Sequence, residues 1–351
     1  MREAFRQRGI SALLWSKSHP WLVARALAAV PRVSIPPEPY EDLLCVGLVQ
    51  LQVEMATNAG AYARQMARLA ADAVRQGAQL VIFPEYTGLG TLGLLPGMVN
   101  LSRQLSLSQA LEELGGEGKI SLGDILRFVA PAARRTYHRT FSLLAQRLRV
   151  YLMAGTIILP AEDGRLYNCA HLYGPTGQLI GVQRKLHLYP MEEGWLSAGD
   201  ELPVFELPFT RLAIPVCMDH SFWETARSAY LRGAEILIDP AADGQGDQEY
   251  HAARGVRMRV QESPCFGLHV YAITDVFGLH WRGRSCVAAP SALLPPGQHL
   301  LAQAATDDAE EVLIADLDLA ALRAYRREHP LELQPALYQR YLLQLYSEIT
   351  G

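Results

Sequence analysis

The sequence contains few cysteines, and their arrangement argues against a disulfide framework. There are five, an odd number, and none stands in the CxxC spacing that is typical of zinc and redox sites. Scattered single cysteines are typical of proteins in a reducing compartment, so we expect a cytoplasmic protein. The cysteines are Cys45, Cys169, Cys217, Cys265 and Cys286.

Long apolar runs and a strong excess of one charge are also missing. No apolar run approaches the ~20 residues that a membrane-spanning helix needs. The basic N-terminus lacks the continuous apolar segment of a signal peptide, because residues 16–20 are polar or proline. The net charge is −4, and both signs are mixed along the chain. We therefore expect neither a membrane nor a nucleic acid as a partner.

Half of the 351 residues are apolar, which is enough for one large α/β domain. We divide the chain into three parts. Residues 1–42 are predicted to be an N-terminal extension with a proline-rich linker, residues 43–318 the main domain, and residues 319–351 a helical tail. The extension is expected to pack on its own or on a neighbouring subunit, and a membrane-surface anchor is the weaker alternative.

Apolar runs of strand length alternate with amphipathic segments in the main domain. The run 44–51 precedes a helix that ends at Gly77, and the run 80–83 then ends at Pro84 and Glu85. Helix, glycine and strand recur in this order over residues 223–240. This pattern suits two sheets packed face to face with helices outside. Further strands are expected over residues 151–159, 167–173, 178–186, 270–274, 285–289 and 312–317.

Residues 88–149 look like an insertion after Glu85. Helices are expected near residues 102–114, 122–129 and 134–147. A long segment that follows a catalytic candidate often forms a lid or a pocket wall, and we expect one of these roles here.

Three polar residues stand at the ends of apolar runs. They are Glu85, Lys185 and Cys217. Each has an ordinary structural explanation by itself, since a cysteine after a strand is usually a core residue and the charged residues are usually solvated. Polar groups at strand ends, however, face the crevices in which α/β sheets bind ligands. Their flanking residues decide between these interpretations.

The flanking residues resemble the three signature regions of the nitrilase superfamily, in the family's order. A Tyr-Asn-x-Ala hairpin and two later blocks are also similar to the family, so that the resemblance runs over residues 44–317. It implies an α/β fold, a four-layer α-β-β-α sandwich of the carbon–nitrogen hydrolase type. The signature regions are Phe83-Pro84-Glu85, Arg184-Lys185-Leu186-His187-Leu188 and Val216-Cys217-Met218-Asp219, the hairpin is Tyr167-Asn168-Cys169-Ala170 before Gly174-Pro175-Thr176-Gly177, and the later blocks are residues 232–237 and 283–290.

The resemblance also implies the roles of these residues. Cys217 would attack the carbonyl carbon and form a thioester. Glu85 would be the general base, and Lys185 would stabilise the oxyanion and favour the thiolate. The backbone N–H of Met218 is the natural second oxyanion donor. No cofactor and no metal is implied, because side chains and water supply all the chemistry.

The family carries a second glutamate downstream of the lysine, and here Glu192 and Glu193 both qualify. We favour Glu193, because it stands in a Glu-Gly-Trp context that resembles the aliphatic amidase branch. It would position Lys185 or the amino group of the substrate; the alternative is an exposed acidic turn. Asp219 is expected to anchor the nucleophile loop rather than to react.

The Met218-Asp219 pair departs from nitrilases, which usually carry Cys-Trp-Glu at this point. This departure favours hydrolysis of an amide or N-carbamoyl compound, with ammonia released; a nitrilase and a non-catalytic scaffold are the alternatives. The expected partner is a small-molecule amide. The family's usual assembly also suggests a homo-dimer or a larger homo-oligomer. We expect the substrate to be bound by Tyr86, Trp195, Met218, His220 and Phe222.

Overall fold

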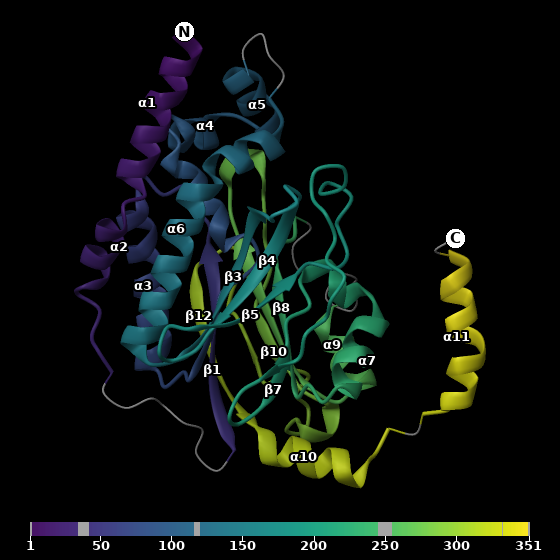
Figure 1. Ribbon diagram of the computed structural model, residues 1–351. Coiled ribbons are helices and arrows are strands. Elements are labelled where there is room, and N and C mark those ends of the chain that lie inside the picture. The colour runs from purple at the N-terminus through teal and green to yellow at the C-terminus, as the bar shows by residue number, and fades with distance from the viewer. Residues whose placement is uncertain (1, 34–41, 116–119, 245–254, 332, 350–351) are drawn as a thin grey trace.

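The computed structural model describes residues 2–33, 42–115, 120–244, 255–331 and 333–349. Its layers lie side by side in Figure 1, with α2, α3 and α6 on one flank, the strands in the middle, and α7 and α9 on the other flank. This arrangement is the four-layer α-β-β-α sandwich that the sequence predicts. No helix in the described part of the chain is long and apolar enough to cross a membrane.

One half of the strands is arranged around β1 (Leu43–Gln52), which pairs in parallel with β2 and antiparallel with β12. Each long strand expected here from the sequence is present, with its ends shifted by one or two residues. The strand order is β5 (Leu179–Arg184), β4 (Leu166–Tyr173), β3 (Tyr151–Pro160), β2 (Leu80–Ile82), β1 and β12 (Glu311–Asp318).

The other half is joined to the first through β9, which meets the end of β1 in only two parallel residue pairs. Leu51 pairs with Ala272, and Gln52 pairs with Ile273. The two halves can therefore turn their faces toward each other. The order here is β6 (Phe205–Glu206), β7 (Arg211–Ala213), β8 (Ile236–Ala241), β9 (Phe266–Ile273), β10 (Cys286–Ala288) and β11 (Ala302–Gln303).

Side chains on the two faces of β1 belong to different cores. Leu44, Val46 and Leu48 lie in the core between the two sheets. Val49 and Leu51 lie in the core between the first sheet and its helices. Because both faces are covered, the strand is apolar at nearly every position, and burying each such side chain stabilises the fold by about 1.5–3 kcal/mol.

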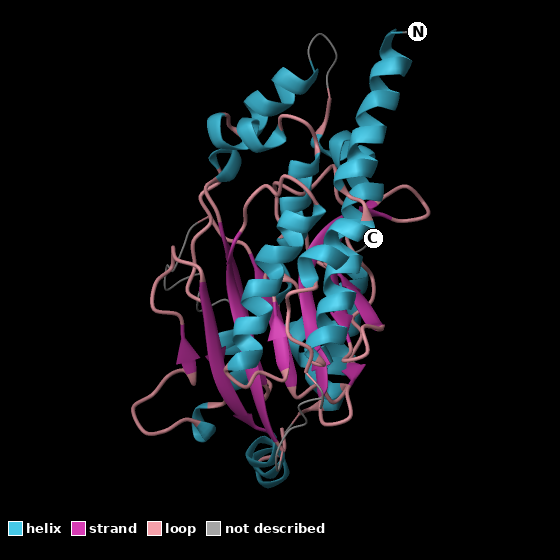
Figure 2. Cartoon of the chain, turned by 90° about the vertical axis from the view of Figure 1, so that its left-hand side faces the viewer, coloured by secondary structure: helices cyan, strands magenta, loops and turns pink. Residues whose placement is uncertain are grey.

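The helices that cover the first sheet are α3 (Ala59–Arg75) and α6 (Leu122–Leu148), and Figure 2 looks onto them with the strands behind. A capping box of Ser121 and Asp124 begins α6. The prediction of two helices in place of α6 is wrong. Pro131 lies on its exposed side, and the buried stripe on the other side continues from Val129 to Tyr137. Packing along this stripe outweighs the hydrogen bond that the proline removes.

The N-terminal extension packs on its own subunit. It contains α1 (Arg2–Lys17) and α2 (Pro20–Leu27). Val23 and Leu27 are buried in the core beneath α3 and α6, and Leu14 packs with Leu94 and Ala132. The proline-rich linker lies largely outside the described residues.

The remaining helices lie at the periphery. The insertion forms η1 (Thr87–Leu94), α4 (Met98–Gln104) and α5 (Leu107–Gly115). Helices α4 and α5 contact η3 (Val276–Gly278). The second sheet is covered by α7 (Trp223–Leu231) and α9 (Val256–Glu262). The tail forms α10 (Leu319–Glu328) and α11 (Pro335–Ile349), and α11 is set off from the body in Figure 1.

Candidate active site

Glu85 lies directly after β2, where a glycine of the neighbouring strand makes room for its turn. Gly155 of β3 has a φ of +70°, and a Cβ there would stand 2.1 Å from the carbonyl oxygen of Pro84. The Tyr86 N–H donates to Thr156 Oγ1 at 2.8 Å. Tyr86 itself has a φ of 55°, which is unusual for a residue other than glycine. Strand β3 thus fixes the turn that buries the Glu85 side chain.

Lys185 follows β5 and reaches two buried carboxylates. Its Nζ lies 2.9 Å from Glu85 Oε1 and 2.8 Å from Glu192 Oε2. Asn168 Nδ2 donates to the same Glu85 oxygen at 2.8 Å. Among the described residues, Glu85 Oε2 has no hydrogen-bond partner. One oxygen of Glu85 is therefore held in place, and the other is available to take up a proton.

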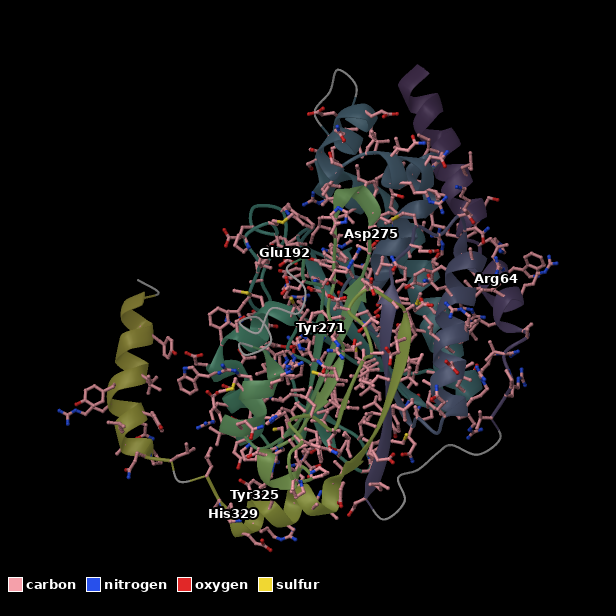
Figure 3. The ribbon with its side chains drawn as sticks, turned by 180° about the vertical axis from the view of Figure 1, so that it is seen from behind. Arg64, Glu192, Tyr271, Asp275, Tyr325 and His329 are labelled. Carbon is pink, nitrogen blue, oxygen red and sulfur yellow. The ribbon has the colours of Figure 1, made fainter. Side chains whose placement is uncertain are left out.

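The carboxylate beside Lys185 belongs to Glu192, not to Glu193, so the preference for Glu193 is corrected here. Glu192 is buried, accepts a hydrogen bond from the Tyr86 hydroxyl, and accepts the Tyr189 N–H at 2.7 Å. Glu193 is exposed. The turn closed by the Glu192 N–H on the Tyr189 carbonyl directs residue 192 inward, and Figure 3 shows Glu192 on this loop beside the sheets. Sequence spacing could not decide which of two adjacent turn residues points inward.

Cys217 begins the short 3-10 helix η2 (Cys217–Ser221), which follows β7. Its φ of 49° is left-handed, a conformation that costs a residue with a side chain on the order of 1–3 kcal/mol. The residue is half-buried, whereas Val216 before it is fully buried. A sharp turn therefore presents the thiol at the end of a buried segment.

Asp219 holds this turn to the segment that carries Lys185. Its fully buried carboxylate accepts the N–H groups of Val216 at 2.8 Å, Leu186 at 3.1 Å and His187 at 2.7 Å. His187 Nδ1 lies 3.0 Å from the same group. The prediction that Asp219 anchors the nucleophile loop is confirmed, and the anchor also reaches the lysine segment.

Replacing Asp219 by alanine should lower the free energy of unfolding by about 3–5 kcal/mol, because one buried and two part-buried N–H groups would lose their acceptor. Urea unfolding of the purified variant measures this loss. Asp308, which is exposed, provides the matched control, and Asp308→Ala should change stability by less than about 0.5 kcal/mol. Equal and small losses in both variants would contradict the anchoring role.

Burial and neighbouring charges together shift the pKa values of Glu85, Lys185 and Cys217. Burial raises the pKa of Glu85 to about 7, with Lys185 opposing the shift and Glu192 adding to it. Burial lowers the pKa of Lys185, but Glu85, Cys217 and Glu192 outweigh it and bring the value above the ordinary one. Burial and the Glu85 charge raise the pKa of Cys217, against the effect of Lys185. The resting state thus pairs a neutral thiol with a charged lysine and a carboxyl that titrates near neutrality.

A second buried polar group lies next to Cys217. Asp239, within β8, has Oδ2 3.4 Å from His269 Nε2 and Oδ1 3.9 Å from His220 Nε2. Burial, with Glu85 and Asp219, raises the pKa of Asp239 well above its usual range. Burial also lowers the pKa of His220 to about 4. Burial lowers the pKa of His269 well below its usual value too, so both partners of Asp239 are neutral near pH 7. Sequence reasoning missed this group because its members come from three separate segments.

Aromatic rings surround the glutamate and lysine groups. Tyr86 stacks on Trp281 with ring centroids 5.2 Å apart, and His187 stacks on Phe222 at 4.1 Å. Trp195 donates from Nε1 to a backbone carbonyl at 2.6 Å. Tyr86 thus positions Glu192, a role that its assignment to substrate binding did not anticipate.

Three of the other expected substrate-binding residues, Met218, His220 and Phe222, lie in η2 or directly after it, next to Cys217. Met218 and Phe222 are half-buried, and so is Trp195, whereas His220 is only 1 % exposed. Their contact with a substrate stays a prediction. Asn168 is the one further residue of the site that the sequence pointed to without naming its role, since the Tyr-Asn-x-Ala hairpin contains it.

Comparisons with known proteins identify the family of this chain. A family model described as carbon-nitrogen hydrolase matches residues 45–327. The chain is 30% identical over 261 residues to a protein of Pyrococcus abyssi named nitrilase, covering 74% of this chain and 84% of that protein. It is 29% identical over 199 residues to the omega-amidase NIT2 of Homo sapiens, covering 54% of this chain and 69% of that protein.

A solved structure has the same fold. Nit3 of Saccharomyces cerevisiae, a member of branch 10 of the nitrilase superfamily, aligns with a TM-score of 0.63. The alignment covers 85% of this chain and 99% of that chain, at 22% sequence identity. At this identity the likeness concerns the fold alone, and it confirms the sandwich expected from the sequence.

Proposed function

This chain belongs to the carbon–nitrogen hydrolase family of the nitrilase superfamily, and from that premise we propose that it hydrolyses a small amide or N-carbamoyl compound through a covalent intermediate on Cys217. Hydrolysis of a carbon–nitrogen bond follows from the family. The substrate class, the intermediate and the release of ammonia are our proposal. The observation that supports it is the buried series Glu85, Lys185 and Glu192, whose first two members act electrostatically on the Cys217 thiol.

In the first half-reaction, Glu85 takes the thiol proton while the Cys217 sulfur forms a bond to the carbonyl carbon. The tetrahedral intermediate collapses when its carbon–nitrogen bond breaks. Glu85 returns the proton to the leaving nitrogen, which departs as ammonia. The acyl or carbamoyl group remains on the sulfur.

In the second half-reaction, Glu85 takes a proton from water, and the resulting hydroxide attacks the same carbon. The carbon–sulfur bond breaks, and the proton on Glu85 passes to the Cys217 sulfur. The free Oε2 of Glu85 suits both transfers, because Lys185 and Asn168 hold only Oε1. A pKa of about 7 lets the carboxyl give and take protons at neutral pH.

Negative charge develops on the substrate oxygen in both half-reactions. Lys185 is buried and positively charged, so its attraction is screened less than it would be in water. The Met218 N–H, next to the strained Cys217, is the proposed second donor. Glu192 would hold the ammonium in place so that no reorganisation is needed during the reaction.

The pH dependence of kcat/KM follows from the role of Glu85. The base must be ionised, so kcat/KM should fall about tenfold per pH unit below a pH of about 7. Glu85→Gln should lower kcat/KM by about 10²–10⁴-fold and remove the acid limb. Initial rates across a buffer series measure both. A flat profile between about pH 5 and 8 in the unmodified enzyme would contradict the assignment.

A second candidate function is nitrile hydrolysis, which the likeness to the Pyrococcus abyssi nitrilase favours. Ammonia release from short aliphatic amides, N-carbamoyl amino acids and nitriles, each beside Cys217→Ala, separates the candidates. Release from amides or carbamoyl compounds that disappears in the variant supports our proposal. Release from nitriles alone would replace it, and release that persists in the variant would refute the role of Cys217.

We also propose a homo-oligomer in which α11 packs on a second copy. Leu337, Tyr338, Tyr341, Leu343 and Tyr346 are exposed along this helix. The Tyr346 hydroxyl donates to Glu224 of α7. The exposed apolar face supports packing on a neighbouring subunit over packing on its own core.

A further inference from the structure

Positive and negative charges are mixed along the chain, but the folded protein distributes them unevenly over its surface. Helices α1, α2, α3 and α6 form one outer layer. Their side chains that the structure describes include 10 arginines and lysines against 2 acidic residues, a net charge of +8. The whole chain has a net charge of −4, so the remainder carries −12. The sequence conceals this segregation, because the four helices come from three separate segments. The fold thus creates one basic face on an acidic protein.

Several of these charges are free to attract a partner. Arg68 pairs with Glu310, Asp72 pairs with Arg75, and Asp124 lies near Arg127. The exposed Arg25, Arg64 and Arg139, in contrast, have no carboxylate at ion-pair distance among the described residues. Helix α2, which carries Arg25, packs against both α3 and α6, which carry the other two. Figure 3 shows Arg64 in this layer, on the side of the molecule away from Glu192.

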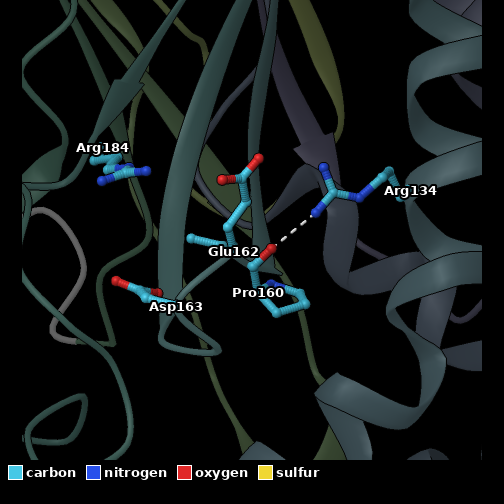
Figure 4. A pocket seen from close by; sticks show the side chains of 6 residues that line it. Arg134, Pro160, Glu162, Asp163 and Arg184 are labelled. Atoms are coloured by element: carbon cyan, nitrogen blue, oxygen red, sulfur yellow. Dashed lines mark hydrogen bonds between the residues drawn. The ribbon is translucent and has the colours of Figure 1, made fainter.

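The arginines of α6 do not all belong to this face. Arg134 donates to the Pro160 carbonyl at 2.8 Å and borders a groove with Glu162, Asp163 and Arg184, shown in Figure 4. Two acidic and two basic side chains line this groove, so its charge is balanced. The basic face therefore lies on the α1, α2 and α3 side of α6.

Large apolar side chains are exposed on the same face. Trp15 is 53 % exposed, Trp21 is 55 % and Leu13 is 47 %. The guanidinium of Arg25 lies 5.1 Å from the Trp21 ring, and that of Arg135 lies 4.6 Å from the Trp15 ring. Tryptophan beside arginine is the composition of helices that lie in the headgroup region of a membrane. The positive charges could also attract a nucleic acid. A nucleic acid, however, would not explain why two tryptophans and a leucine are exposed on these helices.

We propose that this face binds the surface of an anionic lipid bilayer, with α1 and α2 lying against the headgroups. Anionic lipids attract the arginines, and the indole rings enter the headgroup region. Such binding is peripheral and needs no helix that crosses the membrane. It favours the membrane-surface anchor, the weaker alternative for the N-terminal extension, over the expectation that the protein has no membrane partner. It does not depend on the catalytic proposal, because the face and the active site use different residues.

Co-sedimentation with vesicles tests the proposal. The full chain should sediment with vesicles of equal phosphatidylcholine and phosphatidylglycerol, and remain in solution with phosphatidylcholine alone. Arg25→Glu with Arg64→Glu should lower the partition coefficient at least about 25-fold, roughly fivefold for each arginine lost. Trp15→Ala with Trp21→Ala should lower it several-fold. Raising the salt concentration should release the protein, since screening weakens surface electrostatics.

Arg327→Glu with Arg340→Glu is the matched control, because it changes the net charge equally on α10 and α11. It should leave sedimentation unchanged, and thermal unfolding of all variants checks their folding. The proposal is overturned if the full chain ignores anionic vesicles, or if both arginine pairs have the same effect. It is also overturned if the tryptophan variant binds vesicles as strongly as the unmodified chain does and the unmodified chain binds an RNA homopolymer more tightly than it binds the vesicles.

Discussion

Cys217→Ala should lower kcat/KM for ammonia release by about 10⁴–10⁶-fold, the largest effect of any single substitution in this protein. Alanine removes the thiol that would carry the acyl intermediate, while Glu85 and Lys185 remain. Cys217→Ser should be almost as severe. Its hydroxyl holds its proton more tightly than a thiol, and a carboxylate with a pKa of about 7 would ionise it poorly.

Cys45 provides the matched control for this experiment. It is the other half-buried free cysteine, and it lies on β1. Burial, with Asp316, raises the pKa of its thiol to about 12, so it is a poor nucleophile. Cys45→Ala should retain kcat/KM within about twofold. Loss of activity in both alanine variants would indicate damage to folding, and activity that survives Cys217→Ala would refute the mechanism.

Glu192→Gln should lower kcat/KM by about 10²–10³-fold, whereas Glu193→Gln should change it less than about twofold. The first substitution removes the carboxylate 2.8 Å from Lys185 Nζ and weakens the link through Tyr86. The buried ammonium is then held by Glu85 alone and is free to shift. The second substitution affects an exposed side chain.

The pH profile distinguishes positioning from a general loss of structure. Glu192 raises the pKa of Glu85, so its replacement by glutamine should lower that pKa. The acid limb of kcat/KM should therefore move to lower pH in Glu192→Gln and stay in place in Glu193→Gln. If Glu193→Gln shows the larger loss, or if neither profile moves, Glu192 does not act on the Glu85–Lys185 pair.

The sequence predicted the parts of the fold that depend on local pattern. Continuously apolar runs identified the buried strands, and their burial on both faces implied two covered sheets. The break expected inside α6 was wrong. A proline on the exposed side of this helix destabilises it less than the packing of its buried stripe stabilises it. The basic face was invisible, since only the tertiary fold brings α2, α3 and α6 together.

The sequence predicted the site residues that combine a position after a strand with a suitable side chain. It did not predict those whose direction is set by a turn. Glu85, Lys185 and Cys217 each follow a strand, so their convergence could be inferred from their positions. The choice between Glu192 and Glu193 depends on a local turn, in which the Glu192 N–H donates to the Tyr189 carbonyl. No periodicity encodes that bond. The Asp239 and His269 pair likewise depends on the register of β8 on β9.

The most direct test of the central claim is the mass of the protein during turnover. The unmodified enzyme and Cys217→Ala are mixed with the amide that releases ammonia fastest, quenched in acid, and measured by intact-protein mass spectrometry with peptide mapping. Our account predicts a mass increase of one acyl group on the peptide that contains Cys217, absent from the variant and removed by hydroxylamine. An acyl group on another residue, or the same adduct in Cys217→Ala, would contradict it.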